Sequence, residues 1–273
     1  MVEFSPPDPL LESVLGFWDE AGLDVASARA LARNLARAPR RQDQGPAPAQ
    51  RSAPARQPAA KGPVEKAQAL AAAAATLDEL AAAIDGFDGC ALKASARRSV
   101  FADGVQGAPI MAIGEAPGRD EDEAGLPFVG RAGQLLDRMF AAIGASRRDN
   151  LFITNAVFWR PPGNRTPDAG ELAVCRPFLD RAIVLCAPKI LVLVGGVAGQ
   201  TVLRRTEGVM RLRGKRISHI QPGLTDPLNA MVILHPAYLL RRPQEKGLAW
   251  TDLQAISGWM DQLGVARGQT GPG

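Results

Sequence analysis

The chain has 273 residues, of which 46% are hydrophobic and 22% charged, and its formal net charge is +4. This composition is that of a globular protein with a sizeable core, and three cysteines are too few for a disulfide framework. No apolar run reaches the roughly 18 to 20 residues that cross a bilayer, and no basic start precedes an apolar stretch, so we expect a cytoplasmic protein without a membrane partner. The mild positive charge is compatible with a polyanionic partner and equally with an ordinary basic enzyme.

The first part of the chain divides into a helical segment and a linker. Residues 1–38 carry apolar side chains at helical spacing, which predicts a helical hairpin broken near Gly22. Residues 39–63 are rich in Ala, Pro, Gln and Arg and hold no aliphatic side chain larger than alanine. Such a segment buries too little apolar surface to fold, so we predict a disordered tether. Its mostly basic charges leave open a second interpretation, an arm that slides along nucleic acid.

The main predicted domain covers residues 64–267, and residues 268–273 form a tail. A helix over 64–84 opens this domain, and apolar runs then alternate with helical patterns. The runs predict strands at 109–113, 151–155, 190–194 and 231–234, with helices at 132–143, 169–185, 197–203 and 250–263. This alternation predicts the α/β class, as a three-layer αβα sandwich with a short four-stranded parallel sheet.

Polar or ring-bearing side chains come at the ends of three of these strands. Glu115 follows the first strand, Asn155 ends the second, and His235 follows the fourth. Because the carboxyl ends of parallel strands lie at one edge of a sheet, where open α/β folds bind ligands, we expect these side chains to converge. Each alone has an ordinary structural explanation, such as turn capping or a buried histidine, and their combination favours a site.

Two loops add chemistry to the same edge. Phe128 stands between a proline and a glycine-bounded helix start, where its ring suits a planar ligand, although most phenylalanines are core residues. The loop after Asn155 holds Arg160, Asn164 and Arg165 among prolines, which suits contacts to phosphate. Solvated arginines on a stiff loop are the alternative. No glycine fingerprint of a nucleotide-binding loop is present, which disfavours nucleotide cofactors.

Three motifs together resemble the family 4 uracil-DNA glycosylases. They are GEAPG at 114–118 with GLPFVGRAGQLL at 125–136, TN at 154–155 with RPPGNR at 160–165, and HPAYLL at 235–240. The resemblance implies an αβα domain that hydrolyses the N-glycosidic bond of deoxyuridine in DNA and so starts base excision repair. No lysine stands in these motifs ready to form a Schiff base, so we expect a monofunctional enzyme without lyase activity, acting as a monomer on uracil-containing DNA close to the nucleoid.

The resemblance assigns roles to the residues at the sheet edge. Glu115, Asn155 and His235 match the catalytic residues: Glu115 supports the attacking water, Asn155 reads the O4 and N3 edge of uracil, and His235 donates toward O2. The remaining uracil-binding positions are Gly114, Ala116 and Phe128, of which Phe128 matches the ring that stacks on the flipped base.

Other positions correspond to contacts with DNA. The resemblance places Arg160, Asn164, Arg165, Leu239 and Arg241 against DNA, with Leu239 filling the gap that the flipped nucleotide leaves. Ala116 stands where the best-known branch of the superfamily carries a water-activating aspartate. The general base is therefore open: Glu115 orients the water, or the bond breaks with little need of a base.

Family 4 enzymes hold a 4Fe–4S cluster on four cysteines, and this chain keeps a cysteine at only two of those positions. Cys90 and Cys175 fill the second and fourth places, whereas Phe87 and Trp159 fill the first and third. Neither ring can replace a thiolate, and Cys186 lies about three helical turns beyond Cys175. We therefore expect no cluster and no other metal, with Cys90 and Cys175 as vestigial positions and Phe87 and Trp159 packed together as an apolar plug.

A second function is open from the sequence alone. A non-catalytic protein that binds uracil or retains the abasic product in damaged DNA would need the same pocket. Ala116 and the basic linker leave room for this alternative, and release of uracil from an oligonucleotide separates it from the enzyme.

Overall fold

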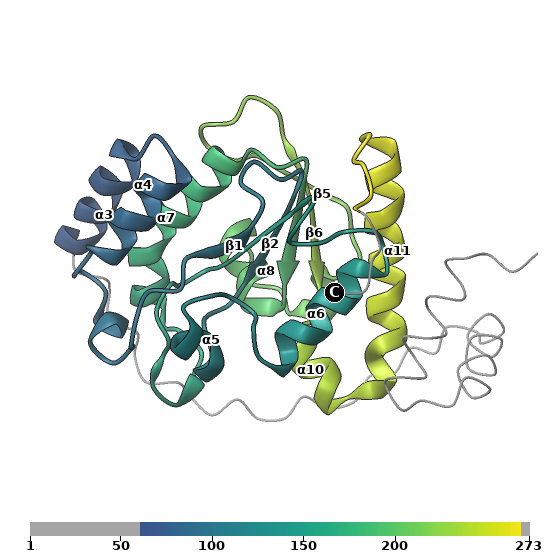
Figure 1. Ribbon diagram of the computed structural model, residues 1–273, viewed down its shortest axis with the longest axis horizontal. Helices are drawn as coiled ribbons and strands as arrows, with labels where there is room; N and C mark the ends of the chain where they lie inside the picture. Colours follow the sequence, from purple (N-terminus) through teal and green to yellow (C-terminus); the bar gives the residue numbers. More distant parts are fainter. Residues whose placement is uncertain (1–60, 269–273) are drawn as a thin grey trace, which may run out of the picture. The chain divides into compact units, whose positions relative to one another are not determined.

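The computed structural model describes residues 61–268 (Figure 1). The hairpin predicted over 1–38, most of the linker predicted over 39–63 and nearly all of the tail predicted over 268–273 lie outside these residues. Within the described range, no helix combines the length and the apolar character needed to cross a membrane.

A six-stranded sheet with the order β1-β3-β2-β4-β6-β5 forms the centre of the domain. Its strands are β1 (Ala102–Gly104), β2 (Ile110–Gly114), β3 (Leu151–Asn155), β4 (Ile190–Val194), β5 (Ile217–His219) and β6 (Leu228–Ile233). β2, β3, β4 and β6 are parallel, as predicted, whereas β1 and β5 are antiparallel strands at the two edges that the prediction of four strands missed. Both are short and partly exposed, so neither carries the apolar run of a buried strand.

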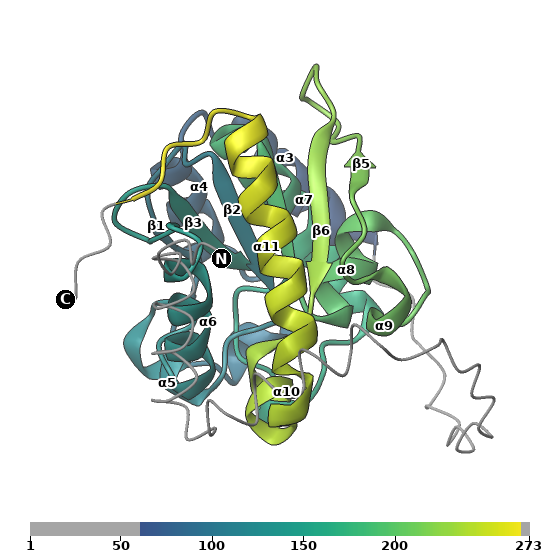
Figure 2. The same cartoon turned by 90° about the vertical axis from the view of Figure 1, so that its right-hand side faces the viewer.

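Helices cover both faces of the sheet, which confirms the predicted α/β class and its three layers (Figures 1 and 2). One side carries α3 (Lys61–Ala73), α4 (Leu77–Asp85), α7 (Ala169–Cys186) and α8 (Gly196–Leu203). The other side carries α6 (Arg131–Ala141) and α11 (Lys246–Gln262). Because both faces are covered, β2, β3 and β4 are buried at every position.

The helix predicted over 64–84 is two helices in the structure. The Thr76 hydroxyl accepts a hydrogen bond from the N–H of Glu79 at 3.1 Å, and the Glu79 carboxylate accepts one from the N–H of Ala75 at 2.7 Å. This reciprocal capping starts α4 at Leu77 and separates it from α3. Both helices pack against α7.

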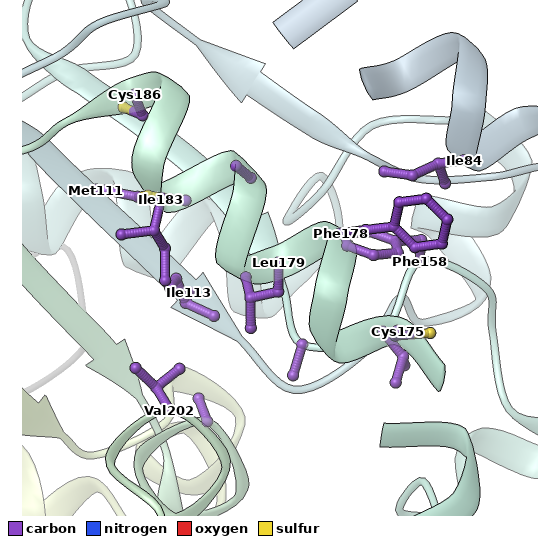
Figure 3. Close-up of a cluster of buried hydrophobic side chains, with 14 of the residues drawn as sticks. Ile84, Met111, Ile113, Phe158, Cys175, Phe178, Leu179, Ile183, Cys186 and Val202 are labelled. Carbon is purple, nitrogen blue, oxygen red and sulfur yellow. The ribbon is translucent and has the colours of Figure 1, made fainter. Parts of the chain in front are cut away.

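The core on this side of the sheet joins β2 to α7. Figure 3 shows Met111 and Ile113 of β2 beside Leu179 and Ile183 of α7, and all four side chains are fully buried. Phe178 extends the same cluster toward α4. This packing holds β2 rigidly, and β2 delivers the first residues of the site.

Three short helices follow the C-terminal ends of the parallel strands or lie close to them. They are α5 (Arg119–Ala124), α9 (Val209–Leu212) and α10 (Pro236–Arg241). In Figure 1, α5 and α10 both lie at the lower end of the sheet, with α6 between them. The site forms between them.

Candidate active site

The ends of β2, β3 and β6 open into one cavity of about 560 Å³. The structure brings most of the predicted site residues to its wall: Glu115, Ala116, Phe128, Asn155, Asn164, Arg165, His235 and Arg241. Gly114, Arg160 and Leu239 do not line it. The convergence expected from parallel strand ends is therefore observed for the three strands that carry Glu115, Asn155 and His235.

Gly114 allows an amide and an aromatic ring to approach each other at the floor of the cavity. It pairs with Asn155 across β2 and β3. A Cβ on Gly114 would lie 2.3 Å from Oδ1 of Asn155 and 2.5 Å from Cζ of Phe128. Any side chain at this position would push the amide and the ring out of place, so only glycine fits here.

The Asn155 amide is buried with an unpaired carbonyl oxygen. Its side chain is 1% exposed, and Oδ1 has no hydrogen-bond partner within residues 61–268. A buried polar atom without a partner costs free energy, and such atoms are rare in folded proteins. Since Asn155 lines the cavity, a ligand with an N–H donor can supply the missing partner.

His235 presents one particular ring nitrogen as a donor. It caps α10, where its Nδ1 accepts the N–H of Ala237 at 3.2 Å, so the proton of the neutral ring resides on Nε2. Burial lowers the pKa of His235 to about 4, and the positive charge of Arg241 acts in the same direction. At neutral pH the ring is uncharged and donates through Nε2.

Glu115 is the carboxylate at the end of β2. Burial raises its pKa above the ordinary value, and a hydrogen bond with Thr166 opposes this effect. Ala116, the next residue, has no group that could transfer a proton. Asp120 and Glu121 also line the cavity, but both oxygens of Glu121 accept backbone N–H groups from Gly118, Val129 and Gly130 at 3.0 Å.

The predicted contacts to DNA differ in how available they are. Arg165 forms a bidentate pair with Glu171, and Arg160 donates to Oδ1 of Asn164 at 2.7 Å. Leu239 does not fit its predicted role, because its side chain is 1% exposed and packs into the domain. The next residue of α10, Leu240, is 36% exposed. Successive helical residues point in different directions, which the motif alone does not resolve.

Several further residues line the cavity wall, most of them inside the motifs, without having been assigned to the site from the sequence. They are Pro117, Gly118, Arg119, Asp120, Glu121, Gly130, Arg131, Ala132, Pro161, Ala237 and Tyr238. The acidic run after Gly118 was a usable signal, because a glutamate at the third position of a helix commonly accepts the N–H of the residue before that helix. Glu121 makes this contact in α5.

The four positions that resemble cluster ligands lie in the hydrophobic core and do not line the cavity. The rings of Phe87 and Trp159 are 6.4 Å apart, and Phe87 meets Phe178 edge-on at 5.2 Å. Cys90 and Cys175 are buried free thiols in hydrogen-bond contact, and burial raises the pKa of Cys175 well above its ordinary value.

A 4Fe–4S cluster needs four thiolates, and this donor set supplies two thiols and two aromatic rings. The side chains here therefore do not fit the cluster. Among residues 61–268, no group of three or more His, Cys, Asp or Glu side chains could hold a metal ion.

Known proteins are similar in sequence to most of the domain. The family model of the uracil DNA glycosylase superfamily matches residues 101–254. The type-4 uracil-DNA glycosylase of Pyrobaculum aerophilum is 36% identical over 190 residues, which are 67% of this chain and 93% of that protein. The type-4 enzyme of Archaeoglobus fulgidus is 36% identical over 185 residues, covering 66% and 92%.

A third type-4 enzyme matches a shorter part of the chain. The type-4 uracil-DNA glycosylase of Thermotoga maritima is 36% identical over 153 residues, covering 56% of this chain and 77% of that protein. The matched region contains the cavity, both loops beside it and the parallel strands. The chain therefore belongs to the uracil DNA glycosylase superfamily and resembles its type-4 members.

Proposed function

We propose that this protein is a monofunctional uracil-DNA glycosylase, which hydrolyses the bond between uracil and deoxyribose in DNA and so starts base excision repair. The observation that carries the proposal is the buried Asn155 amide. Its carbonyl oxygen has no partner among the residues that the structure describes, and it lies at the wall of a cavity that also presents Phe128 and His235. The similarity to type-4 uracil-DNA glycosylases supports the same reaction.

The Asn155 amide is complementary to one edge of uracil. Its Oδ1 accepts from the N3–H of uracil while its NH₂ group donates to O4. Cytosine has an acceptor at N3 and a donor at position 4, so the same amide meets two mismatched groups. With the carbonyl oxygen placed to meet N3 and the NH₂ group placed to meet position 4, the amide favours uracil over cytosine.

The cavity receives a base only after the base has left the duplex. Flipping costs a few kcal/mol of lost stacking and pairing. The ring of Phe128, 7% exposed and 5.8 Å from the ring of His235, provides a flat surface on which the flipped base stacks. Stacking offsets part of the cost of extrusion.

His235 stabilises the departing base. When the glycosidic bond breaks, uracil leaves as an anion with negative charge on O2. The neutral His235 ring donates its Nε2–H to this oxygen, and its tautomer is set in advance by the bond from the N–H of Ala237. No reorganisation of the ring is needed as the charge develops.

Glu115 serves the sugar side of the reaction. The deoxyribose becomes positively charged as the bond breaks, and an ionised Glu115 at the end of β2 stabilises this charge and orients the attacking water. Ala116 offers no second carboxylate. We assign no separate general base, because a bond that breaks largely before water attacks leaves little proton transfer to assist.

The DNA contacts complete the proposal. Arg160, Asn164, Arg165 and Arg241 lie at or beside the cavity wall and would contact the phosphates next to the lesion. We assign the filling of the gap in the duplex to Leu240 and not to Leu239, because Leu240 is exposed and Leu239 is buried. In this proposal the enzyme acts as a monomer on chromosomal DNA.

We further propose that the enzyme works without a 4Fe–4S cluster. The aromatic rings of Phe87 and Trp159 pack at two of the four ligand positions, and the buried thiols of Cys90 and Cys175 remain at the other two. The reaction steps above involve none of these residues.

Release of free uracil from a labelled uracil-containing oligonucleotide tests the proposed function. We expect stoichiometric release in a single turnover by the wild-type chain. Asn155→Asp should slow release from uracil and reduce selection against cytosine, because a protonated carboxyl can match the cytosine edge. Asn229→Asp is the matched control: Asn229 lies at the start of β6 and its Oδ1 only accepts from Arg216.

Two outcomes would contradict the proposal. Binding of the oligonucleotide without release of uracil would indicate a damage-binding protein. Unchanged rates and base selection in Asn155→Asp would remove Asn155 from base recognition.

A further inference from the structure

Phe128 has a backbone conformation that its own side chain disfavours. Its φ is +55°, in the left-handed region, where a Cβ crowds the neighbouring carbonyl. Within residues 61–268, four non-glycine residues have a positive φ, and Phe128 is the aromatic one. The place of the ring beside Gly114 and Asn155 depends on this backbone angle, so something must hold it.

Arg147 holds the carbonyl groups at and before Phe128. Its Nη1 donates to the Pro127 carbonyl and its Nη2 to the Phe128 carbonyl, both at 2.7 Å. The Arg147 side chain is 16% exposed, so these charge-assisted bonds are largely shielded from water.

Two carboxylates from different elements fix the Arg147 guanidinium in turn. Nε donates to Asp137 of α6 and Nη1 donates to Asp103 of β1, each at 2.8 Å. Arg147 therefore connects the loop of Phe128 to a helix and to an edge strand. It does not line the cavity, and no motif singled it out.

The chain after Phe128 is held from the opposite side. The Glu121 carboxylate accepts the N–H groups of Val129 and Gly130 at 3.0 Å. Gly133 leaves room for the Phe128 carbonyl, because a Cβ on Gly133 would lie 1.8 Å from that oxygen. Glu121 and Arg147 therefore hold the N–H and the carbonyl of the same Phe128–Val129 peptide, and Arg147 also holds the carbonyl of the peptide before it.

We propose that Arg147 is a positioning residue for base recognition, which keeps Phe128 in the left-handed conformation so that its ring is in place to stack before the base arrives. The inference rests on the proposed function and adds to it a residue that touches neither base nor sugar. Without Arg147, Phe128 relaxes toward an ordinary backbone conformation, and the ring leaves the floor of the cavity in most molecules.

The expected effect is on binding of the base. If the competent ring position is populated in about a tenth of the molecules, the affinity for uracil falls about tenfold, because apparent affinity scales with the competent fraction. This affinity is measured as the inhibition constant of added free uracil in an assay of uracil release from a single-stranded oligonucleotide. We expect Arg147→Met to raise that constant about tenfold and Arg147→Lys, which keeps a donor, to raise it less.

Arg176 provides the matched control. Its side chain is also 16% exposed, pairs with Asp180 at 2.8 Å, and donates to the carbonyls of Thr201 and Val202. It lies on α7 and does not line the cavity. Arg176→Met should lower stability as Arg147→Met does and leave the inhibition constant of uracil unchanged.

A double-mutant cycle with Phe128→Ala separates positioning from general damage. If Arg147 acts through the ring, Arg147→Met has no further effect on uracil inhibition once the ring is gone. An equal effect in both backgrounds, or no effect in either, overturns the inference. Should Arg147→Met not fold, the same cycle with Arg147→Lys decides the question.

A crystal structure of the Arg147 variant gives a readout that does not depend on turnover. We expect Phe128 to leave the left-handed region, and an unchanged φ at Phe128 overturns the inference. A wild-type chain that releases no uracil would contradict the proposed function, while the conformation of Phe128 in the variant would still decide the role of Arg147.

Discussion

His235 shows how a single side chain is prepared for one task. Burial and the nearby Arg241 keep the ring neutral, and the backbone of α10 selects the tautomer that donates through Nε2. An imidazolium would be the stronger donor, but keeping it charged in this buried position would cost more than keeping it neutral. The fold thus provides a neutral donor with a fixed direction.

Replacing His235 by alanine should slow single-turnover release of uracil by roughly 10² to 10³, the usual loss for one donor to a developing anion. Quenched-flow measurement of the released base checks this. His219→Gln is the control, since His219 is a half-buried histidine of β5 that contacts Gln221 and does not line the cavity. A rate within about twofold of wild type in His235→Ala would contradict the assigned role.

The pH dependence follows from the same ring. Because the pKa of His235 is about 4 in the folded protein, the rate should not fall through protonation of His235 as the pH drops from about 7 to about 5. Unfolded, the ring has an ordinary pKa near 6.5 and takes up a proton first. The contribution of His235 to the free energy of unfolding is therefore at its full value above about pH 6.5 and is lost progressively as the pH falls to about 4. Urea unfolding of the wild type and of His235→Gln at several pH values checks this.

Leu239 and Leu240 are neighbours with opposite expected effects. Leu240→Ala should lower uracil release from duplex DNA by about tenfold and leave single-stranded substrate unaffected, because only a duplex has a gap to fill. Leu239→Ala should lower the free energy of unfolding by about 2 to 5 kcal/mol with an unchanged ratio of duplex to single-strand rates. The reverse pattern would return the duplex contact to Leu239.

The elements that the sequence predicts well are those with a long apolar pattern. The four parallel strands and the helices α6, α7, α8 and α11 were all expected, with shifts of a few residues at their ends. The edge strands β1 and β5 and the short helices α5, α9 and α10 were not, because elements of three to six residues bury too little to leave a periodic signal. These short elements include α5 and α10, which border the cavity.

Some residues of the candidate site could likewise be predicted from the sequence, and others could not. Strand ends and motifs placed Glu115, Asn155 and His235, since parallel strands bring their ends together whatever their spacing in the chain. Arg147 could not be found, because its contacts come from a helix, an edge strand and a loop whose arrangement no local pattern encodes. The exposure of Leu240 likewise depends on how α10 is turned against the domain.

The aromatic cluster between α4, α7 and the loop of Trp159 should contribute to the free energy of unfolding. Phe87 is fully buried against Trp159 and Phe178, so Phe87→Ala should lower the free energy of unfolding by about 3 to 5 kcal/mol. Urea unfolding followed by circular dichroism measures this. The wild-type chain, purified under argon, should contain no stoichiometric iron, and a broad visible absorption band would contradict the proposal of a cluster-free enzyme.

The exposed arginines determine how the binding of the molecule to DNA depends on salt concentration. Arg241 is exposed at the cavity wall, so Arg241→Gln should weaken binding to duplex DNA and reduce the slope of log K against log salt by about 0.9, the value for one phosphate contact. Fluorescence anisotropy over a range of salt concentrations measures the slope. Arg148→Gln is the control, because Arg148 is exposed just before β3, at the opposite edge of the sheet. Equal slopes for the two variants would remove Arg241 from the DNA contact.

The packing of Phe87 against Trp159 affects how the protein matures. An enzyme that needs an iron–sulfur centre depends on cellular assembly machinery and on iron supply, and it is exposed to loss of the centre by oxidants. Under the cluster-free proposal, this chain folds from its own side chains as soon as it is made. Repair of deaminated cytosine would then continue during iron starvation or oxidative stress, when deamination does not pause.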